Sequence, residues 1–185
     1  IGVMLIATVS LVEQALLRHV QENRPADAPT FFFIDIQPDQ AQEFVTLVHR
    51  QTGRPNPELT PLVRSRLHAI DGQVIAAEEG SERNHTRAEG KEERGKQWYL
   101  TREYVLTFLD QLPKDNQLVK GTWWKPGQVF STPQVSVEEE AAAHLGLTIG
   151  SLVELDIQGA MISAEVRSIR KVEWGNFSTN FYMIL

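Results

Sequence analysis

The clearest hairpin in the sequence reads Leu152-Val-Glu-Leu-Asp-Ile-Gln-Gly-Ala-Met-Ile-Ser-Ala-Glu-Val-Arg-Ser-Ile-Arg-Lys-Val172. Apolar and polar residues alternate over positions 152–157, which is the pattern of a strand with one buried face. Gln158-Gly159 is a turn signal, and positions 161–172 return with apolar residues on one face. The stretch therefore predicts a β-hairpin within a small sheet or half-barrel.

A short helix is predicted just before this hairpin, over residues 137–145. Ser136, followed three positions later by Glu139, matches a capping box, and the acidic residues at 138–140 complement the positive end of a helix. Gly146 is placed to end the helix in a left-handed cap. Helix and hairpin together predict a β-rich lobe over residues 126–173.

The preceding part of the chain, residues 30–125, predicts strands around one helix. The run Thr30-Phe-Phe-Phe-Ile-Asp-Ile36 is aromatic and β-branched, which favours a strand buried on both faces. Pro38 is expected to open a helix that ends at Gly53. Further strands are expected over residues 61–70, 73–75, 102–108 and 117–124, with Asp71-Gly72 as a tight turn between the first two.

Residues 78–97 are unusually polar, with six acidic and five basic side chains and no apolar residue larger than alanine. Such a composition cannot bury enough surface to order itself. We expect a mobile loop here, with a charged helix as the alternative.

An apolar run opens the sequence, Ile1-Gly-Val-Met-Leu-Ile-Ala-Thr-Val-Ser-Leu-Val12. As a helix it would cover roughly 18 Å of a hydrocarbon core about 30 Å thick. An apolar stripe continues at spacings of three and four through Leu16 and Val20. Residues 1–22 are expected to be the end of a transmembrane helix and a stalk on the outer side, since no Lys/Arg excess follows; a buried core helix is the alternative. Residues 174–185 are expected to form a return strand that is cut short.

The composition excludes several functional classes. The chain has no cysteine, which excludes disulfides, a cysteine-based zinc site and a cysteine nucleophile. Its net charge of -6 and pI near 5.4 argue against a nucleic-acid binder, which would carry a basic face. No Gly-x-x-x-x-Gly-Lys-Ser/Thr loop, Gly-x-Ser-x-Gly elbow or His-Glu-x-x-His motif occurs, so any nucleotide hydrolysis is expected in another chain.

Few residues are candidates for chemistry. Glu140 and His144 stand one helical turn apart, which suits two ligands of one metal or an ordinary i, i+4 pair, and no third ligand lies close in the sequence. Asp35 lies in an aromatic run, where an ionised carboxylate is costly unless paired. We expect it at a strand end, bonded to a backbone or basic group, with a catalytic role as the alternative. Four other histidines are scattered without a shared pattern: His19, His49, His68 and His85.

Aromatic residues and a charged strand exit complete the candidates. Trp123 and Trp124 are expected to alternate faces on a strand, so that one is in the core and the other is an outward contact. Arg170-Lys171 followed by Glu173-Trp174 suits docking and equally suits an ordinary surface. No catalytic, cofactor-binding or metal-ligating residue is predicted, and no cofactor is expected.

Short motifs along nearly the whole chain are specific as an ordered set, although each one alone is unspecific. They are Asp27-Ala-Pro-Thr-Phe-Phe-Phe-Ile-Asp-Ile-Gln-Pro-Asp-Gln40, Pro61-Leu-Val-Arg-Ser-Arg-Leu67 with Ile70-Asp-Gly72, Leu112-Pro-Lys-Asp-Asn116 with Gly121-Thr-Trp-Trp124, Val135-Ser-Val-Glu-Glu139 with Leu145-Gly-Leu147 and Asp156-Ile-Gln-Gly159, and Arg170-Lys-Val-Glu-Trp174 with Asn180-Phe181. Together they resemble the extracytoplasmic domain of ABC-transporter permeases of the FtsX-like (MacB/LolC) family, especially its YbbP-type permeases.

The resemblance implies an α+β fold with a porter-like α/β part over residues 30–125 and a β-rich, sabre-like lobe over residues 126–173. It implies a permease subunit of the bacterial inner membrane, with this domain in the periplasm, that works in a dimeric assembly with a separate ABC ATPase subunit. ATP-driven motion of the membrane helices would be coupled to export or extraction of a hydrophobic or envelope substrate, such as a periplasmic protein or a lipid-like molecule. From the residues alone, a membrane-anchored extracytoplasmic binding or sensor module and an anchored hydrolase remain alternatives.

Overall fold

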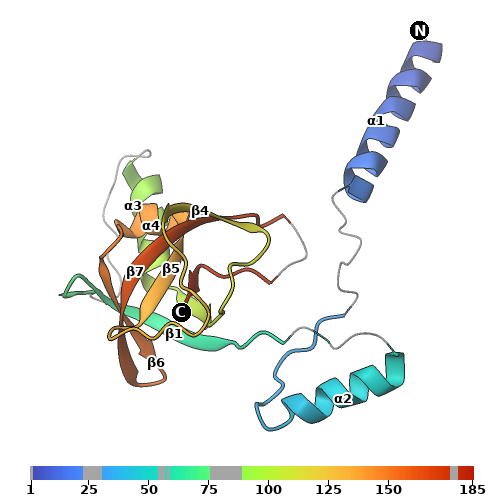
Figure 1. The fold of residues 1–185 in the computed structure, drawn as a ribbon. Coiled ribbons are helices and arrows are strands. Elements are labelled where there is room, and N and C mark those ends of the chain that lie inside the picture. Colours follow the sequence, from blue (N-terminus) through green and yellow to red (C-terminus); the bar gives the residue numbers. More distant parts are fainter. Residues whose placement is uncertain (1, 23–30, 54–56, 58, 76–88, 176–178) are drawn as a thin grey trace. The chain divides into compact units, whose positions relative to one another are not determined.

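The computed structural model describes residues 2–22, 31–53, 57, 59–75, 89–175 and 179–185. The chain forms two compact units. The N-terminal unit comprises Ile1–Leu59 and Trp174–Thr179, and the barrel unit comprises Thr60–Glu173 and Asn180–Leu185. Figure 1 shows the elements of each unit.

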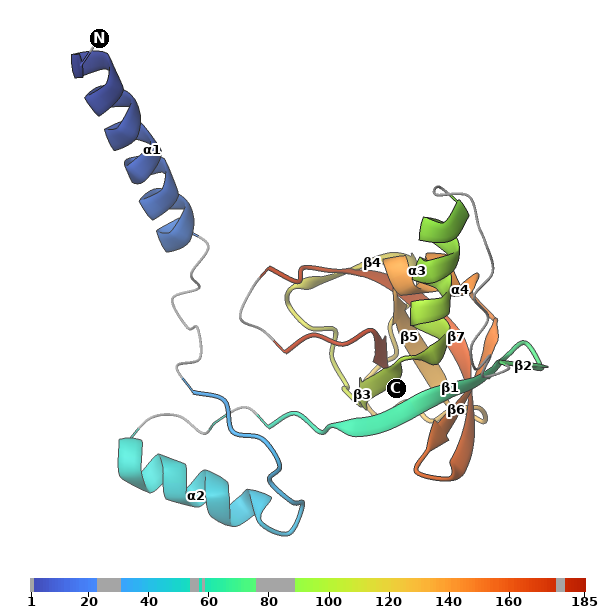
Figure 2. The same ribbon diagram turned by 180° about the vertical axis from the view of Figure 1, so that it is seen from behind.

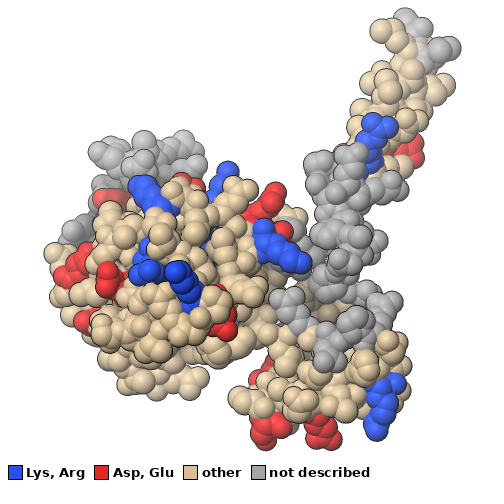
Figure 3. All heavy atoms as spheres, in the orientation of Figure 1, with Lys and Arg blue, Asp and Glu red and all other residues tan. Residues whose placement is uncertain are grey.

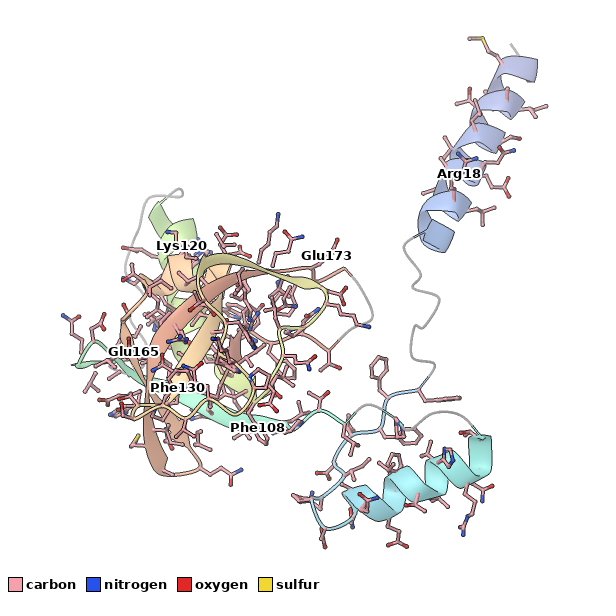
Figure 4. The ribbon with its side chains drawn as sticks, in the orientation of Figure 1. Arg18, Phe108, Lys120, Phe130, Glu165 and Glu173 are labelled. Carbon is pink, nitrogen blue, oxygen red and sulfur yellow. The ribbon has the colours of Figure 1, made fainter. Side chains whose placement is uncertain are left out.

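Helix α1 of the N-terminal unit spans Gly2–Glu22, which confirms a continuous helix running from the apolar stretch into the predicted stalk. Its apolar side chains are exposed, for example Met4 at 78% and Ile6 at 68%. Arg18, labelled in Figure 4, belongs to its polar second half. None of the helices in the described part of the chain is both long enough and apolar enough to cross a bilayer. The transmembrane assignment of residues 1–22 therefore stays a prediction.

The predicted buried strand over residues 30–36 is wrong for the part that the structure describes. Residues 31–36 form no strand, and Phe31 and Ile34 are 76% and 80% exposed. The backbone of Asp35 has a φ of 64°, which interrupts an extended run. Phe33 instead packs edge-to-face against Phe44, with ring centroids 5.0 Å apart. High β-propensity does not make a strand where no described neighbour offers a ladder.

Helix α2, Ala41–Thr52, follows this segment as predicted, although it begins three residues after Pro38. Gly53 ends it with a φ of 63°, and its N–H donates to the carbonyl oxygen of His49 at 2.9 Å. The left-handed cap at Gly53 is therefore confirmed. Ala41, Phe44, Val45 and Val48 are only half-buried, so the helix has no buried residue.

A closed ring of strands forms the barrel unit. The elements in chain order are β1 (Val63–Ile70), β2 (Gln73–Val74), α3 (Glu89–Thr101), β3 (Glu103–Thr107), β4 (Asn116–Gly121), β5 (Gln134–Glu138), α4 (Glu139–Leu145), β6 (Leu152–Ile157), β7 (Ala160–Val172) and β8 (Met183–Ile184). The pairings β1–β3, β3–β8, β8–β5, β5–β7, β7–β6 and β6–β1 return to the starting strand. β2 pairs with β1 alone, and β4 pairs with β7 alone.

The β6–β7 hairpin is confirmed. Ile157 pairs with Ala160. Gln158 and Gly159 between them have φ values of 54° and 92°, which is the left-handed geometry of a type I′ turn. Asp156 accepts a hydrogen bond from the N–H of Gly159 through its Oδ1 at 2.7 Å. Asp71-Gly72 likewise joins β1 to β2, so that prediction is also confirmed.

The inward side chains of the ring form the core. Alternate residues of most strands point inward, as the period of two requires, with a shift by one residue at a bulge in β7 between Val166 and Ser168. The apolar side chains of this inner set that have no exposed surface are Tyr104 and Leu106 of β3, Val135 and Val137 of β5, Val153 and Leu155 of β6, Ala164 and Val166 of β7, and Met183 of β8. Strands from both predicted parts, residues 30–125 and 126–173, enter this one sheet. The proposed boundary between those parts stays a prediction.

Over residues 89–97 the predicted loop is wrong and its alternative, a charged helix, is confirmed, because these residues belong to helix α3. Residues 76–88 lie outside the described part. The helix is anchored by its C-terminal turn, where Tyr99 is only 6% exposed and Leu100 packs against the core. Figures 1 and 2 both show α3 beside α4. The charged residues of 89–97 are good helix formers. The apolar residues that hold the helix against the core, Tyr99 and Leu100, follow the polar stretch that predicted a loop.

The capping box predicted at Ser136 and Glu139 is also wrong. Residues 134–138 are strand β5, and Ser136 is buried, with its Oγ accepting a hydrogen bond from Ser168 Oγ at 2.8 Å. The N-cap of α4 is Glu138, whose carboxylate accepts from the N–H groups of Glu140 and Ala141 at 3.0 Å and 2.8 Å. The helix thus spans Glu139–Leu145 and not 137–145. Its predicted left-handed end at Gly146, with a φ of 70°, is confirmed.

Candidate functional site

An aromatic–arginine cluster lies where α3 meets the barrel. We define it by Trp98, Tyr99 and Arg102 with Tyr104 and Tyr182. The Arg102 guanidinium carbon lies 4.0 Å from the Trp98 ring centroid, 4.3 Å from that of Tyr182 and 5.4 Å from that of Tyr104. These distances suit cation–π attraction, which is stronger for a partly desolvated cation. The cluster fixes the end of α3 against β3 and the segment that leads into β8.

Tyr99 and Tyr104 are held neutral by their surroundings. The Tyr104 hydroxyl donates to the carbonyl oxygen of Tyr99 at 2.5 Å. Burial, with Glu140 nearby, raises the pKa of Tyr99 to about 12, and burial raises the pKa of Tyr104 still further above its ordinary value. Phenols with such pKa values stay protonated at neutral pH, so they serve here as packing and hydrogen-bonding groups rather than as bases.

The raised tyrosine pKa values predict a loss of stability in alkali. Because the folded state favours the protonated phenols, their stabilising contribution is complete below about pH 10 and is lost as the pH rises through about 12, the pKa of folded Tyr99. Denaturation midpoints measured across this range should fall, and Tyr99→Phe should make the fall shallower. Tyrosinate absorbance at pH 10 in a still-folded protein that Tyr99→Phe or Tyr104→Phe removes would contradict the prediction.

Glu140 and His144 lie on one face of α4, but their contacts are those of a helix surface. His144 Nδ1 lies 2.9 Å from the backbone oxygen of Glu140, and its ring stacks on Tyr99 with centroids 4.7 Å apart. A Cβ at Gly95 would lie 3.2 Å from two ring atoms of His144, so α3 and α4 approach closely there. Among the described residues, no group of three or more His, Asp or Glu side chains is placed to hold a metal ion.

A buried arginine corrects one of the predictions, since Arg170 was expected at a charged strand exit on the surface and lies in the interior. Arg170 of β7 is 0% exposed. Its Nη1 donates to Asn116 Oδ1 at 3.1 Å, and its Nη2 donates to the carbonyl oxygen of Phe181 at 2.6 Å. Burial lowers the pKa of Arg170 to about 10, and the nearby Glu138 carboxylate opposes that shift. The period of two gave no signal for it, because a bulge in the β5–β7 pairing shifts the register after Val166. Ile169 thus joins the core, whereas Arg170 pairs with Glu138.

The other candidates are dispersed. Asp35 accepts a hydrogen bond from Gln37 Nε2 at 3.2 Å, so the predicted backbone or basic partner is replaced by a side-chain amide. Trp123 and Trp124 do not alternate faces, since they follow β4 and stack on each other at 4.0 Å. Their indole N–H groups donate to the backbone oxygens of Asp110 and Leu109. His49 lies on α2 and His68 on β1; His85 and the side chain of His19 lie outside the described residues.

The charges on the barrel surface are mixed. Figure 3 shows Lys and Arg interspersed with Asp and Glu on the face in view. Figure 4 labels Lys120, Glu165 and Glu173 on this unit, with both signs on β4 and β7. Phe130 lies in the loop between β4 and β5. The Arg167 guanidinium carbon lies over its ring, 4.9 Å from the ring centroid. This face therefore offers no single-sign field for a strongly charged ligand.

Comparison with known proteins finds one relative whose protein class is known. No family model matches the chain. An uncharacterized ABC transporter permease of Escherichia coli strain K12, YbbP, is 29% identical over 181 residues. This chain resembles an ABC transporter permease. The match covers 98% of this chain but only 20% of the permease, so the chain spans about one fifth of that relative's length. The predicted resemblance to YbbP-type permeases is confirmed.

One solved structure gives a weaker likeness. It is a crystal structure of a domain from a suspected permease protein of Porphyromonas gingivalis, with 14% sequence identity and a TM-score of 0.33. The match covers 76% of this chain and 54% of that one. A TM-score at this level does not establish a shared fold.

Proposed function

We propose that this chain is part of an ABC-transporter permease subunit, in which residues 1–22 are the end of a transmembrane helix and a stalk and the residues that follow form the extracytoplasmic domain. The observation that carries the proposal is the similarity to YbbP along 98% of this chain. The proposed protein resides in the bacterial inner membrane, has this domain in the periplasm, and works as a dimeric assembly with a separate ATPase subunit. The chain itself contributes no ATPase, since its sequence has no phosphate-binding loop.

The proposed role is mechanical. Motion of the membrane helices, driven by ATP in the partner subunit, passes along α1 to the outer domain and assists export or extraction of a hydrophobic or envelope substrate. Two features support this. α1 is one uninterrupted helix over Gly2–Glu22, which suits a stiff connection. The barrel unit is a closed ring with a continuous core, which suits a body that moves without deforming.

A proline in α1 tests the mechanical role. Leu16 is 61% exposed and lies in the helix interior, so Leu16→Pro removes a backbone donor and kinks the helix, at a cost of about 3 kcal/mol. In the full-length permease with its ATPase subunit, we expect Leu16→Pro to abolish complementation of a strain that lacks the permease. The melting temperature of the purified outer domain should stay unchanged.

Leu16→Ala is the matched control, because it shortens the same side chain and keeps the helix. It should complement like the wild type. Full complementation by Leu16→Pro, with a kink verified by circular dichroism or spin-label distances, would argue against transmission through α1. That result would favour a membrane-anchored binding or sensor module instead.

A further inference from the structure

The guanidinium of Arg102 has donors that the described part of the fold does not use. Its Nε and Nη1 are buried, and no hydrogen-bond acceptor among the described residues reaches them. No ion pair to Arg102 is found among these residues either. A buried donor without a partner is costly, and a cation without a counter-ion attracts an anion. The aromatic–arginine cluster therefore has an unused capacity to bind one.

Two rings of the cluster hold this guanidinium in place. Its carbon lies 4.0 Å from the Trp98 ring centroid and 4.3 Å from that of Tyr182, and the two rings are inclined at 78° to each other. They enclose the cation on two sides and leave Nη2 of the half-buried Arg102 for a ligand. A ligand thus meets an oriented donor and need not order a flexible side chain, which favours binding.

Trp98 adds an apolar surface beside the cation. It is 49% exposed, although the rings of Tyr99 and Tyr182 contact it. Tyr182 is half-buried. Tryptophan, tyrosine and arginine are the residue types that contribute most to binding at protein–protein interfaces. A ligand that uses both the ring and the guanidinium must carry an anionic group next to an apolar one.

The charges around the cluster favour a single carboxylate over a surface with many negative charges. Glu103 follows Arg102 and has a side chain that is 47% exposed, and Glu140 of α4 acts electrostatically on Tyr99. The whole chain has a net charge of -6. These carboxylates repel an anionic membrane surface, whereas one acidic side chain of a polypeptide meets less repulsion.

We propose that Trp98, Arg102 and Tyr182 form a docking site for a partner polypeptide that presents one carboxylate beside an apolar or aromatic side chain. The carboxylate accepts a hydrogen bond from Arg102 Nη2, and the neighbouring side chain packs on the exposed part of the Trp98 ring. The site lies within the barrel unit, so the inference does not rest on the proposed transport function.

Titration of the chain with hydrocinnamate, followed by NMR, tests the site, because this probe joins one carboxylate to one aromatic ring. We expect saturable shifts of the Trp98 indole N–H and Arg102 Nε–H signals. The neutral match, hydrocinnamamide, should bind at least about tenfold more weakly, since a hydrogen bond between charged groups contributes that much. Phenethyl methyl phosphate, a phosphodiester with the same ring, should also bind more weakly than hydrocinnamate.

Two variants separate the site from the rest of the surface. Arg102→Gln keeps a polar side chain and removes the charge, so it should weaken hydrocinnamate binding about tenfold. Arg167→Gln is the matched control, because Arg167 also lies over a ring, that of Phe130, with a buried Nε that has no acceptor among the described residues. It should leave the binding unchanged. If Arg102→Gln does not fold, the comparison of acid and amide on the wild-type chain decides the matter.

Several results would overturn the docking site. One is the absence of a saturable shift with hydrocinnamate, and another is equal binding of the acid and the amide. Unchanged binding by a folded Arg102→Gln would show that the cation is not used. Tighter binding of the phosphodiester would indicate a lipid headgroup in place of a polypeptide.

Discussion

Replacing Gly121 by alanine is expected to lower the free energy of unfolding by about 3 kcal/mol or more, which places it among the most damaging single substitutions. Gly121 ends β4 with a φ of 76°, which an L-residue adopts only with strain. An added Cβ would lie 2.1 Å from the backbone oxygen of Arg167 and 3.0 Å from Ser168 Cα. Backbone atoms cannot move aside as a side chain does, so β4 would have to separate from β7.

Gly127→Ala is the matched control, because it separates the effect of steric overlap from the effect of backbone strain. Gly127 has nearly the same φ, 73°, but an added Cβ there would meet nothing within 4 Å. It should therefore show only the backbone strain, about 1 kcal/mol. The free energy of unfolding of both variants, measured by urea denaturation, separates the cost of backbone strain from the cost of steric overlap. Equal losses of unfolding free energy at the two sites would mean that β4 moves to accommodate the new methyl group.

Replacing Glu138 by alanine should cost about 3 kcal/mol. The substitution leaves the N–H groups of Glu140 and Ala141 without their acceptor at the start of α4, and loss of such a cap alone costs about 1 kcal/mol. It also removes the buried carboxylate that stabilises the charged form of Arg170, and an uncompensated buried charge is a further penalty. Thermal and urea unfolding measure the sum.

Glu139→Ala provides the comparison. Glu139 is exposed and caps nothing, although the sequence pattern predicted it as half of the capping box. Its replacement should change stability by no more than about 0.5 kcal/mol. Similar losses for the two glutamates would show that the carboxylate of Glu138 contributes little to the cap.

Local signals predicted the elements that local chemistry determines. The β6–β7 hairpin follows from alternation on both sides of Gln158-Gly159, whose left-handed backbone needs no distant partner. The ends of α2 and α4 at Gly53 and Gly146 have the same origin.

Long-range pairing decided what the sequence could not. Residues 134–138 begin like a capped helix, but β7 and β8 on either side make them a strand. The high charge of residues 89–97 predicted a loop. The residues that hold α3 in place follow this stretch, since the rings of Trp98 and Tyr99 contact the ring of Tyr182. Arg170 lies on a predicted strand, but its importance depends on Asn116 and Phe181, which only the folded chain brings beside it.

The position of β8 in the ring has a consequence for the order of folding. Leu106 and Thr107 of β3 cannot obtain their neighbours Met183 and Ile184 until the chain has been synthesised almost to residue 185. Partners so far apart in the sequence give a high contact order. This slows folding, because the chain loses the entropy of closing a long loop before the contact forms and stabilises it. A nascent chain can form the β6–β7 hairpin early, whereas β3 and β5 keep an open side until β8 arrives. During that interval their unpaired edges are available to other chains, so the barrel is most prone to aggregate just before it closes.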